Sequence, residues 1–510
     1  MKNKNHLDHF TVVKILKKFS QKEMNEFEKM INSPFFNNNI VVSNLFKVLK
    51  KYHPDFSDSE ISKQLLFRLA TKKNKYNDKL FRKYLSLINK LAEEYLFILN
   101  SRSNLPAKEI KILEQMSQRN TDDAYKRKLN SLKKLFSNKK IIDLSDFYLL
   151  HNLFVIEHNY NNSHNNIVSL RECGYNSYIN LIYYFIFNSI SIINQLESDV
   201  YSFEDINYVS NIGEIIDRTI LENMINALKK ITSPKDKYLN LFLDLTLNDL
   251  KMNSSDSGIN AYRDLFNLIN IYQKRLSRDV LFYYMQRMIV FCTLENVKGK
   301  YDLTKEIFEN YKFQFKNNLF TLYTSDKLDF LNFRLIINSA LKNNEFEWAE
   351  EFIMDNINKV KEDSRTNILN YAKAVMCFYK NEFTESLNFI SNIKHELLPI
   401  TLDMYILKIK IFYRLGYLDS VRSQTDSFRH FIKNNKLISE YHKVTLLNFL
   451  KFFKTILRLS VKADKIRLNE VIDQIKSSKD TKERKWMLEI AEELLLRNNQ
   501  NSNLLRKFPA

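Results

Sequence analysis

Histidines are the first residues in this chain whose type and spacing could do chemistry. His395-Glu396 begins the pattern His-Glu-x-x-His, which holds zinc on one face of a helix, but Pro399 occupies the second histidine position. Zinc would need both imidazoles, one helical turn apart. The three histidines between residues 151 and 164 would need a carboxylate or thiolate from elsewhere to complete a site. The sequence therefore predicts no metal site.

The glycines argue against nucleotide binding. Phosphate-cradling and dinucleotide-binding turns need closely spaced residues that tolerate positive φ. The chain has only 5 glycines, all isolated, so neither a Walker loop nor a Gly-x-Gly-x-x-Gly turn can form. Adjacent acids such as Glu350-Glu351 point about 100° apart on a helix, as solvated residues do. We predict no catalytic residue, no cofactor and no enzymatic activity.

The cysteines indicate a reducing compartment. Cys173, Cys292 and Cys377 are odd in number and far apart, which fits neither a disulfide framework nor a paired thiolate site. The first ten residues alternate Lys, Asn and His without an apolar core, so they do not resemble a secretory signal. We therefore expect a cytoplasmic protein.

One apolar segment, residues 173–195, is long enough to cross a bilayer and contains no charged residue. Several Asn and Ser side chains interrupt it, and neither end carries a Lys or Arg cluster to set an orientation. We expect no membrane span here, but a helix buried on most of its surface inside a stack of helices.

The composition predicts an all-α protein. The 510 residues are 45% hydrophobic, with 38 Phe and 27 Tyr, so the chain can bury large cores. With only 5 Gly and 6 Pro, it has few residues for tight turns, which favours helices joined by short polar connections. The length is too great for one core, so we expect an extended or repetitive architecture.

The N-terminal region, residues 1–104, is predicted to form a separate helical domain. Ser20 with Glu23, and Ser57 with Glu60, have the spacing of a capping box, in which a hydroxyl and a carboxylate satisfy the first backbone N–H groups of a helix. Apolar residues with helical spacing follow both pairs.

Residues 20–98 resemble the N-terminal part of a bacterial family of uncharacterised all-helical proteins. The resemblance implies a helical domain and carries no activity. The residues that carry it are Phe27, Ser33-Pro34-Phe35-Phe36-Asn37, Leu45-Phe46 and Lys75-Tyr76-Asn77-Asp78.

The second half contains an internal repeat, built on four short polar turns. Each turn has an aromatic residue, and a small residue follows three positions later. An aromatic that closes the turn and a small residue one helical turn on would let two antiparallel helices approach closely. The four pairs are Tyr301 and Thr304, Phe346 and Ala349, Phe383 and Ser386, and Tyr417 and Ser420.

This pattern resembles the tetratricopeptide family over residues 280–435. The resemblance implies a solenoid of stacked helical hairpins, which we extend to residues 141–460. Residues 461–510 are expected to cap its open end, with Asp480 and Glu483 as another capping pair. Trp-Leu-Gly is missing from the first helices and the intervals vary, so we expect a degenerate solenoid.

Positive charge is concentrated in the first part of the chain. Residues 1–140 carry 30 Lys and Arg against 14 Asp and Glu. Residues 105–140 are expected to form basic connecting helices, where Lys126, Arg127, Lys133 and Lys134 could contact an anion. The simpler alternative is a solvated helix face in a Lys-rich protein.

These features favour a protein–protein interaction scaffold, in which a groove of helical repeats receives an unidentified protein or peptide. This step is an analogy with other helical-repeat proteins. The alternative function is a nucleic-acid-binding or regulatory protein that uses the basic N-terminal region.

Overall fold

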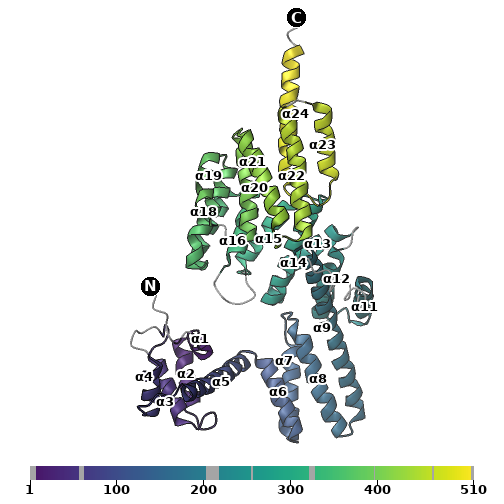
Figure 1. Cartoon of the computed structure of the whole chain (residues 1–510). Coiled ribbons are helices and arrows are strands. Elements are labelled where there is room, and N and C mark those ends of the chain that lie inside the picture. Colours follow the sequence, from purple (N-terminus) through teal and green to yellow (C-terminus); the bar gives the residue numbers. More distant parts are fainter. Residues whose placement is uncertain are drawn as a thin grey trace. The chain divides into compact units, whose positions relative to one another are not determined.

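The fold is all-α. In the computed structural model the described residues are 7, 9–56, 62–202, 217–253, 257–320, 328–394, 397–461 and 464–506. The described residues are 80% helical and form 23 α-helices and no strand (Figure 1). The expected fold class is confirmed at this level.

The helices follow one another with short connections. Their bounds are α1 Thr11–Leu16, α2 Gln21–Ile31, α3 Ile40–Lys50, α4 Lys63–Thr71, α5 Asp78–Ser103, α6 Leu105–Gln118, α7 Asp122–Ser137, α8 Ser145–Ser163, α9 Ile167–Ser202, α11 Arg218–Ile231, α12 Lys237–Met252, α13 Gly258–Tyr272, α14 Arg278–Lys298, α15 Thr304–Lys316, α16 Phe330–Lys342, α17 Phe346–Asn356, α18 Glu362–Tyr379, α19 Phe383–Ser391, α20 Leu398–Arg414, α21 Leu418–Asn434, α22 Glu440–Val461, α23 Lys465–Ser477 and α24 Arg484–Arg506.

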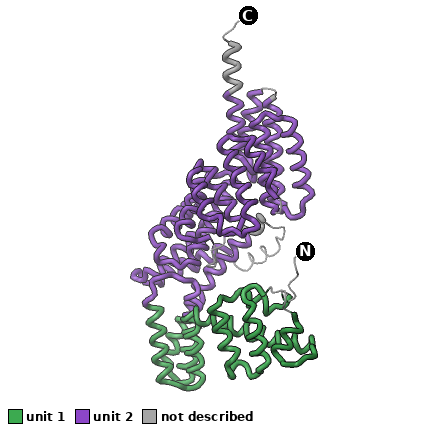
Figure 2. The backbone as a smooth tube through the Cα atoms, turned by 90° about the vertical axis from the view of Figure 1, so that its left-hand side faces the viewer, with its two compact units in different colours: residues 1–137, 152–177 green, residues 138–151, 178–510 purple. Residues whose placement is uncertain are grey.

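The chain forms two compact units. Unit 1 contains residues 1–137 and 152–177, and unit 2 contains residues 138–151 and 178–510 (Figure 2).

Unit 1 has a core of its own, formed by α1–α5. Phe27 packs edge-on against Phe46 and also contacts Tyr95, and all three side chains are buried. The predicted capping box at α2 is confirmed: Ser20 Oγ accepts a hydrogen bond from Glu23 N, and Glu23 accepts one from Ser20 N. The second predicted box, Ser57 with Glu60, lies outside the described residues.

Unit 2 is built from hydrophobic cores that share helices. One core extends from the start of α8 to α15, a second from α14 to α20, and a third from α20 to α24. Helix α20 contributes Met404 and Leu407 to the second core and Ile406 and Ile409 to the third. The second and third cores are therefore adjacent and meet at α20.

Three of the predicted turns have the same backbone geometry. Asn344, Asn381 and Gly416 adopt left-handed φ values of 60°, 64° and 75°. The next N–H in each case, such as Glu345 N to Ala340 O at 3.1 Å, bonds to the carbonyl five residues earlier. This bond ends a helix by satisfying one of its last carbonyls. The three turns therefore share one backbone conformation.

The structure corrects the alignment of the fourth turn by one residue. Phe346 and Phe383 are the first residues of their helices, but the corresponding residue of α21 is Leu418, and Tyr417 precedes the helix. Tyr417 is 55% exposed, and Ser420 is exposed as well. The buried residue that corresponds to Ala349 is Val421.

The first turn is longer than the others. Gly299 adopts a left-handed φ of 75°, but α15 begins only at Thr304. Thr304 is therefore the first residue of its helix, whereas Ala349 and Ser386 are the fourth of theirs, so the two kinds of position are not equivalent.

The helix that contains the apolar segment 173–195 is not mostly buried. Residues 167–197 of α9 are long and apolar enough to cross a membrane, and 33% of the most apolar stretch is buried. Tyr175 and Tyr178 are 59% and 66% exposed. The expectation of a mostly buried helix is therefore wrong. One such helix among the described residues is weak evidence for a membrane span.

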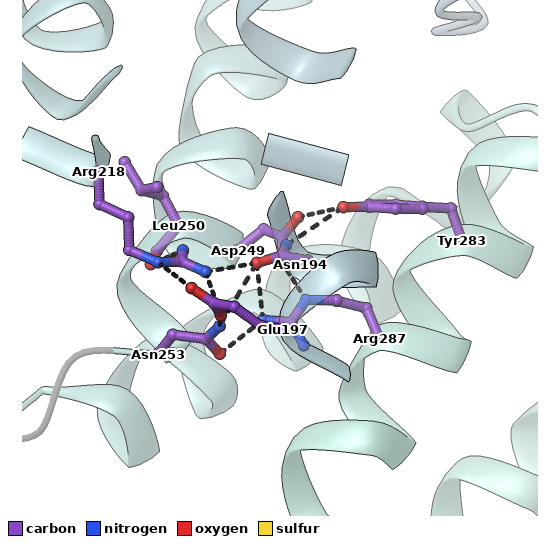
Figure 3. Close-up of polar contacts among 8 residues, drawn as sticks. All are labelled: Asn194, Glu197, Arg218, Asp249, Leu250, Asn253, Tyr283 and Arg287. Carbon is purple, nitrogen blue, oxygen red and sulfur yellow. Dashed lines mark hydrogen bonds and ion pairs between the residues drawn. The ribbon is translucent and has the colours of Figure 1, made fainter. Parts of the chain in front are cut away.

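A buried polar network holds four helices of unit 2 together. Asp249 of α12 forms an ion pair with Arg287 of α14 at 3.1 Å and accepts a hydrogen bond from Tyr283 at 2.6 Å (Figure 3). Asn194 of α9 donates to the same carboxylate, and its side-chain oxygen accepts from Arg218 of α11. Buried charges are stable in such a place because the carboxylate faces a guanidinium and accepts further hydrogen bonds.

Gly299 and Gly416 have the same φ of 75°, and together they test whether Arg484 of α24 holds the end of α14. A side-chain carbon added at Gly299 would overlap the guanidinium of Arg484, whereas at Gly416 it would meet open space. Arg484 donates to the carbonyls of Val297 and Lys298, both at 3.2 Å.

Gly299→Ala is expected to lower the free energy of unfolding by about 1 to 2 kcal/mol more than Gly416→Ala, measured by urea titration. Both variants bear the strain of a left-handed alanine, about 1 kcal/mol, but only the first loses the bonds of Arg484. Equal losses in the two variants would show that Arg484 does not hold this turn.

Candidate functional site

A cavity of about 790 Å³ lies in unit 2 and is the candidate site. Cavities of roughly 300 to 1,000 Å³ are typical of ligand sites. Its walls come from the end of α14, the α14–α15 turn, the start of α15, one face each of α16, α18 and α20, and the segment 481–492 at the start of α24. Residues almost 200 positions apart in the sequence therefore meet around one space.

An ion pair joins two of the helices that line the cavity. Arg334 of α16 contacts Asp403 of α20 through two donors, one of them at 2.8 Å. Tyr371 of α18 donates to the same carboxylate at 2.6 Å and accepts from Asn338 at 2.6 Å. Burial acts to raise the pKa of Asp403, but Arg334, Tyr371 and Lys482 together outweigh it and the net pKa is lowered. The carboxylate therefore stays charged and joins α16, α18 and α20.

The start of α24 closes one side of the cavity. Glu483 forms an ion pair with Lys410 of α20, and Lys485 forms one with Asp302 of the α14–α15 turn at 3.1 Å. Arg484, between them, bonds to the last carbonyls of α14. The chain's own C-terminal segment thus bridges α14 and α20.

Glu483 is not the capping residue that the sequence predicted. Helix α24 begins at Arg484, so Glu483 immediately precedes the helix and its carboxylate binds Lys410. Asp480 accepts a hydrogen bond from Tyr441 at 3.0 Å. Both acids join other helices to the start of α24, and the spacing of the two residues in the sequence could not show this.

The Glu483 ion pair gives an expected pH dependence of stability. Burial acts to raise the pKa of Glu483, but Lys410, Lys342 and Lys482 outweigh it and lower the pKa from 4.5 to about 2. Because the folded-state pKa is lowered, this stabilisation is complete above about pH 4.5 and is lost as the pH falls through about 2.

We therefore expect Glu483→Gln to be less stable than the wild type near neutral pH, with a difference that shrinks as the pH falls from about 4.5 towards 2. Urea titration of both proteins across this range measures the difference. A difference that stays constant with pH would contradict the lowered pKa.

Two lysines line the cavity without an acidic partner. Lys342 of α16 and Lys482 have no carboxylate within ion-pair distance among the described residues. Burial lowers the pKa of Lys482 and the nearby charge of Lys342 lowers it further, and together they outweigh the opposite effect of Glu483 and Asp403. The two ammonium groups therefore repel each other at the edge of the same space.

Three buried polar atoms of the cavity wall also lack a hydrogen-bond partner in the described part of the chain. They are Ser339 Oγ, Trp486 Nε1 and Arg484 Nε. Ser339 and Trp486 are only 6% and 7% exposed. An indole N–H and a guanidinium N–H can only donate, and a hydroxyl can donate too.

The residues predicted from the repeat lie mostly outside the cavity. Tyr301 and Thr304 line it, at the α14–α15 turn. The others do not line it: Phe346 and Phe383 are partly buried against the second core, and Ala349 and Ser386 are fully buried. Ser386 Oγ donates to Ala374 O at 2.6 Å, which brings α19 close to α18.

The predicted anion-contact residues lie on α7 in unit 1. Lys126, Arg127 and Lys134 are exposed. Lys133 is half-buried, forms an ion pair with Glu157 at 2.6 Å and lies over the ring of Phe154. The structure therefore does not bring the four side chains together as one free cluster.

No group of three His, Cys, Asp or Glu side chains in the described residues could hold a metal ion. His395 and Glu396 lie outside those residues. The cavity residues were missed because neither Lys342 nor Lys482 belongs to a motif, and the two lie 140 positions apart in the sequence.

The comparisons with known proteins add no name to this geometry. No family model, no curated protein and no solved structure matches the chain. The resemblances to a bacterial helical family and to tetratricopeptide repeats therefore remain expectations.

Proposed function

We propose that the chain is a non-enzymatic interaction scaffold, in which tetratricopeptide-like hairpins form a solenoid and present the cavity to a peptide segment of a partner protein. The observation that carries the proposal is the cavity of about 790 Å³ formed by α16, α18 and α20 together with the start of α24. Its position on successive helices is typical of the inner surface of a helical-repeat protein.

The chemistry of the wall supports a peptide as ligand. Tyr311, Tyr371, Phe378, Tyr379 and Trp486 give it aromatic surface, and Asn296, Asn338 and Ser339 give it hydrogen-bonding groups. Aromatic side chains supply large contact areas at low entropic cost, and amide groups fix the orientation of a bound backbone.

Two leucines of α16 allow a matched test. Leu331 and Leu335 are one helical turn apart and are 38% and 42% exposed, but only Leu335 lines the cavity. Leu335→Trp would fill part of the space, whereas Leu331→Trp adds the same side chain outside it. Both variants should fold, because each leucine already contacts solvent.

The wild type and both variants are applied to an array of immobilised short peptides that combine acidic, basic, aromatic and aliphatic side chains. The proposal expects some peptides to bind the wild type and the Leu331 variant, and to lose at least about tenfold in affinity for the Leu335 variant. Two results would reject it: no peptide bound by the wild type, or equal binding by all three proteins.

A further inference from the structure

The cavity wall contains more hydrogen-bond donors than the chain itself satisfies. Trp486 Nε1, Arg484 Nε and Ser339 Oγ lack partners in the described residues, and the indole is buried. A buried donor without a partner costs about 1–3 kcal/mol. Groups of this kind need an acceptor, and all three line the same space.

The charges of the cavity wall also indicate an anionic ligand. Three of its acids, Asp302, Asp403 and Glu483, are already held by Lys485, Arg334 and Lys410. Lys342 and Lys482 form no ion pair of their own; the charge of Lys342 lowers the pKa of Lys482, although Glu483 and Asp403 act on it in the opposite direction. A bound anion would replace this repulsion by two attractions.

Ser339 and Lys342 belong to the same face of α16. They are three residues apart, which places their side chains one helical turn from each other. Lys482 and Trp486 come from a second element, the first turn of α24 and the residues just before it. Donors from two elements far apart in the sequence thus line one space.

The cavity wall also contains acidic residues. Glu489 and Glu492 line it further along α24, and Glu492 is about 10 Å from Lys485 at the helical rise per residue. The carboxylates that act on Lys482 are Glu483 and Asp403, and each is already paired with another cation, Lys410 or Arg334. Aromatic side chains of the same wall could hold an apolar neighbour of a bound acidic group.

We propose that the cavity binds an anionic group, a carboxylate or a phosphate, between Lys342 and Lys482, with Ser339 Oγ and Trp486 Nε1 as further donors. On the function proposed above, this group is carried by a peptide of the partner protein, next to an apolar or aromatic side chain. The inference rests on that function for the source of the anion, but the anion site itself can be tested alone.

The two tryptophans of the chain provide a direct readout. Trp486 lines the cavity, whereas Trp348 packs against Phe308 and Phe352 in the second core. The full chain, labelled with nitrogen-15 tryptophan, gives two indole N–H signals that Trp348→Phe assigns. Inorganic phosphate is expected to shift the Trp486 signal and to leave the Trp348 signal in place.

The double variant Lys342→Met and Lys482→Met should bind phosphate at least about tenfold more weakly than the wild type. It should fold, because Lys342 is exposed and Lys482 is destabilised in its charged form. Lys305→Met is the matched control, since Lys305 is exposed on α15 and does not line the cavity. Phosphate that leaves Trp486 unmoved, or that binds the double variant as well as the wild type, would overturn the proposal.

A second experiment asks whether a peptide supplies the anion. Its outcomes distinguish a failure of the anion site from a failure of the proposed function. A peptide from the array is compared in three forms, with glutamate, phosphoserine or glutamine at one position. The inference expects tighter binding of one or both charged forms, and a loss of this preference in the double lysine variant. Equal binding of all three forms would keep the peptide groove but reject the anion site. A phosphate response without any peptide binding would keep the anion site but reject the groove.

Discussion

Asp403→Ala is expected to lower the free energy of unfolding by about 3 kcal/mol, measured by urea titration followed by circular dichroism. The carboxylate accepts two donors from Arg334 and one from Tyr371, and Arg334 is 15% exposed. Removing it leaves a charged guanidinium and a buried hydroxyl without their partner. Because these groups belong to α16 and α18, the loss should loosen the cavity wall as well.

The control for this prediction removes both charges. Arg334→Met combined with Asp403→Leu leaves no unpaired charge and fills a similar volume, so it should recover most of the stability lost in Asp403→Ala. A double variant as unstable as the single one, or a single variant within about 0.5 kcal/mol of the wild type, would show that the pair does not join these helices.

Asp249→Ala is expected to cost about 3–5 kcal/mol, the largest effect of a single substitution that we predict. Asp249 is 1% exposed, its ion-pair partner Arg287 is 6% exposed, and Tyr283 and Asn194 donate to the same carboxylate (Figure 3). Burial raises the pKa of Asp249, and Arg287 and Tyr283 act in the opposite direction. The charge is tolerated only because the network surrounds it.

An exposed ion pair of the same unit provides the comparison. Glu350 and Lys380 are 48% and 38% exposed and 2.9 Å apart, and exposed pairs contribute at most about 1 kcal/mol. Glu350→Ala should therefore change the stability by about 0.5 kcal/mol or less. If Asp249→Ala were as mild as Glu350→Ala, the polar network would not be holding its four helices together.

Local features of the fold could be predicted from the sequence. The Ser20–Glu23 capping box depends on residues three positions apart, so its pattern is visible without any tertiary contact. The four repeat turns could be located for the same reason, because each turn depends on residues that are close together in the sequence. Aligning the turns by their aromatic residues places Tyr417 one position too early. The equivalent backbone positions are those of the left-handed residues Asn344, Asn381 and Gly416.

The cavity could not be predicted, because its contacts join distant segments. Arg334 and Asp403 are 69 residues apart, and Arg484 and Lys298 are 186 apart. No periodicity in the sequence shows that the segment 481–492 returns to the α14–α15 turn. The exposed face of α9 was missed for a related reason, since an apolar composition does not show which neighbours cover a helix.

An anomalous difference map from a crystal of the full chain soaked in tungstate, a phosphate analogue, tests the central claim most directly. The claim is that helices α16, α18 and α20 and the start of α24 enclose a ligand site. We predict a tungsten peak between Lys342 and Lys482, close to Trp486. A cavity without a peak, with tungsten bound only at surface lysines such as Lys126 and Lys134, would contradict it.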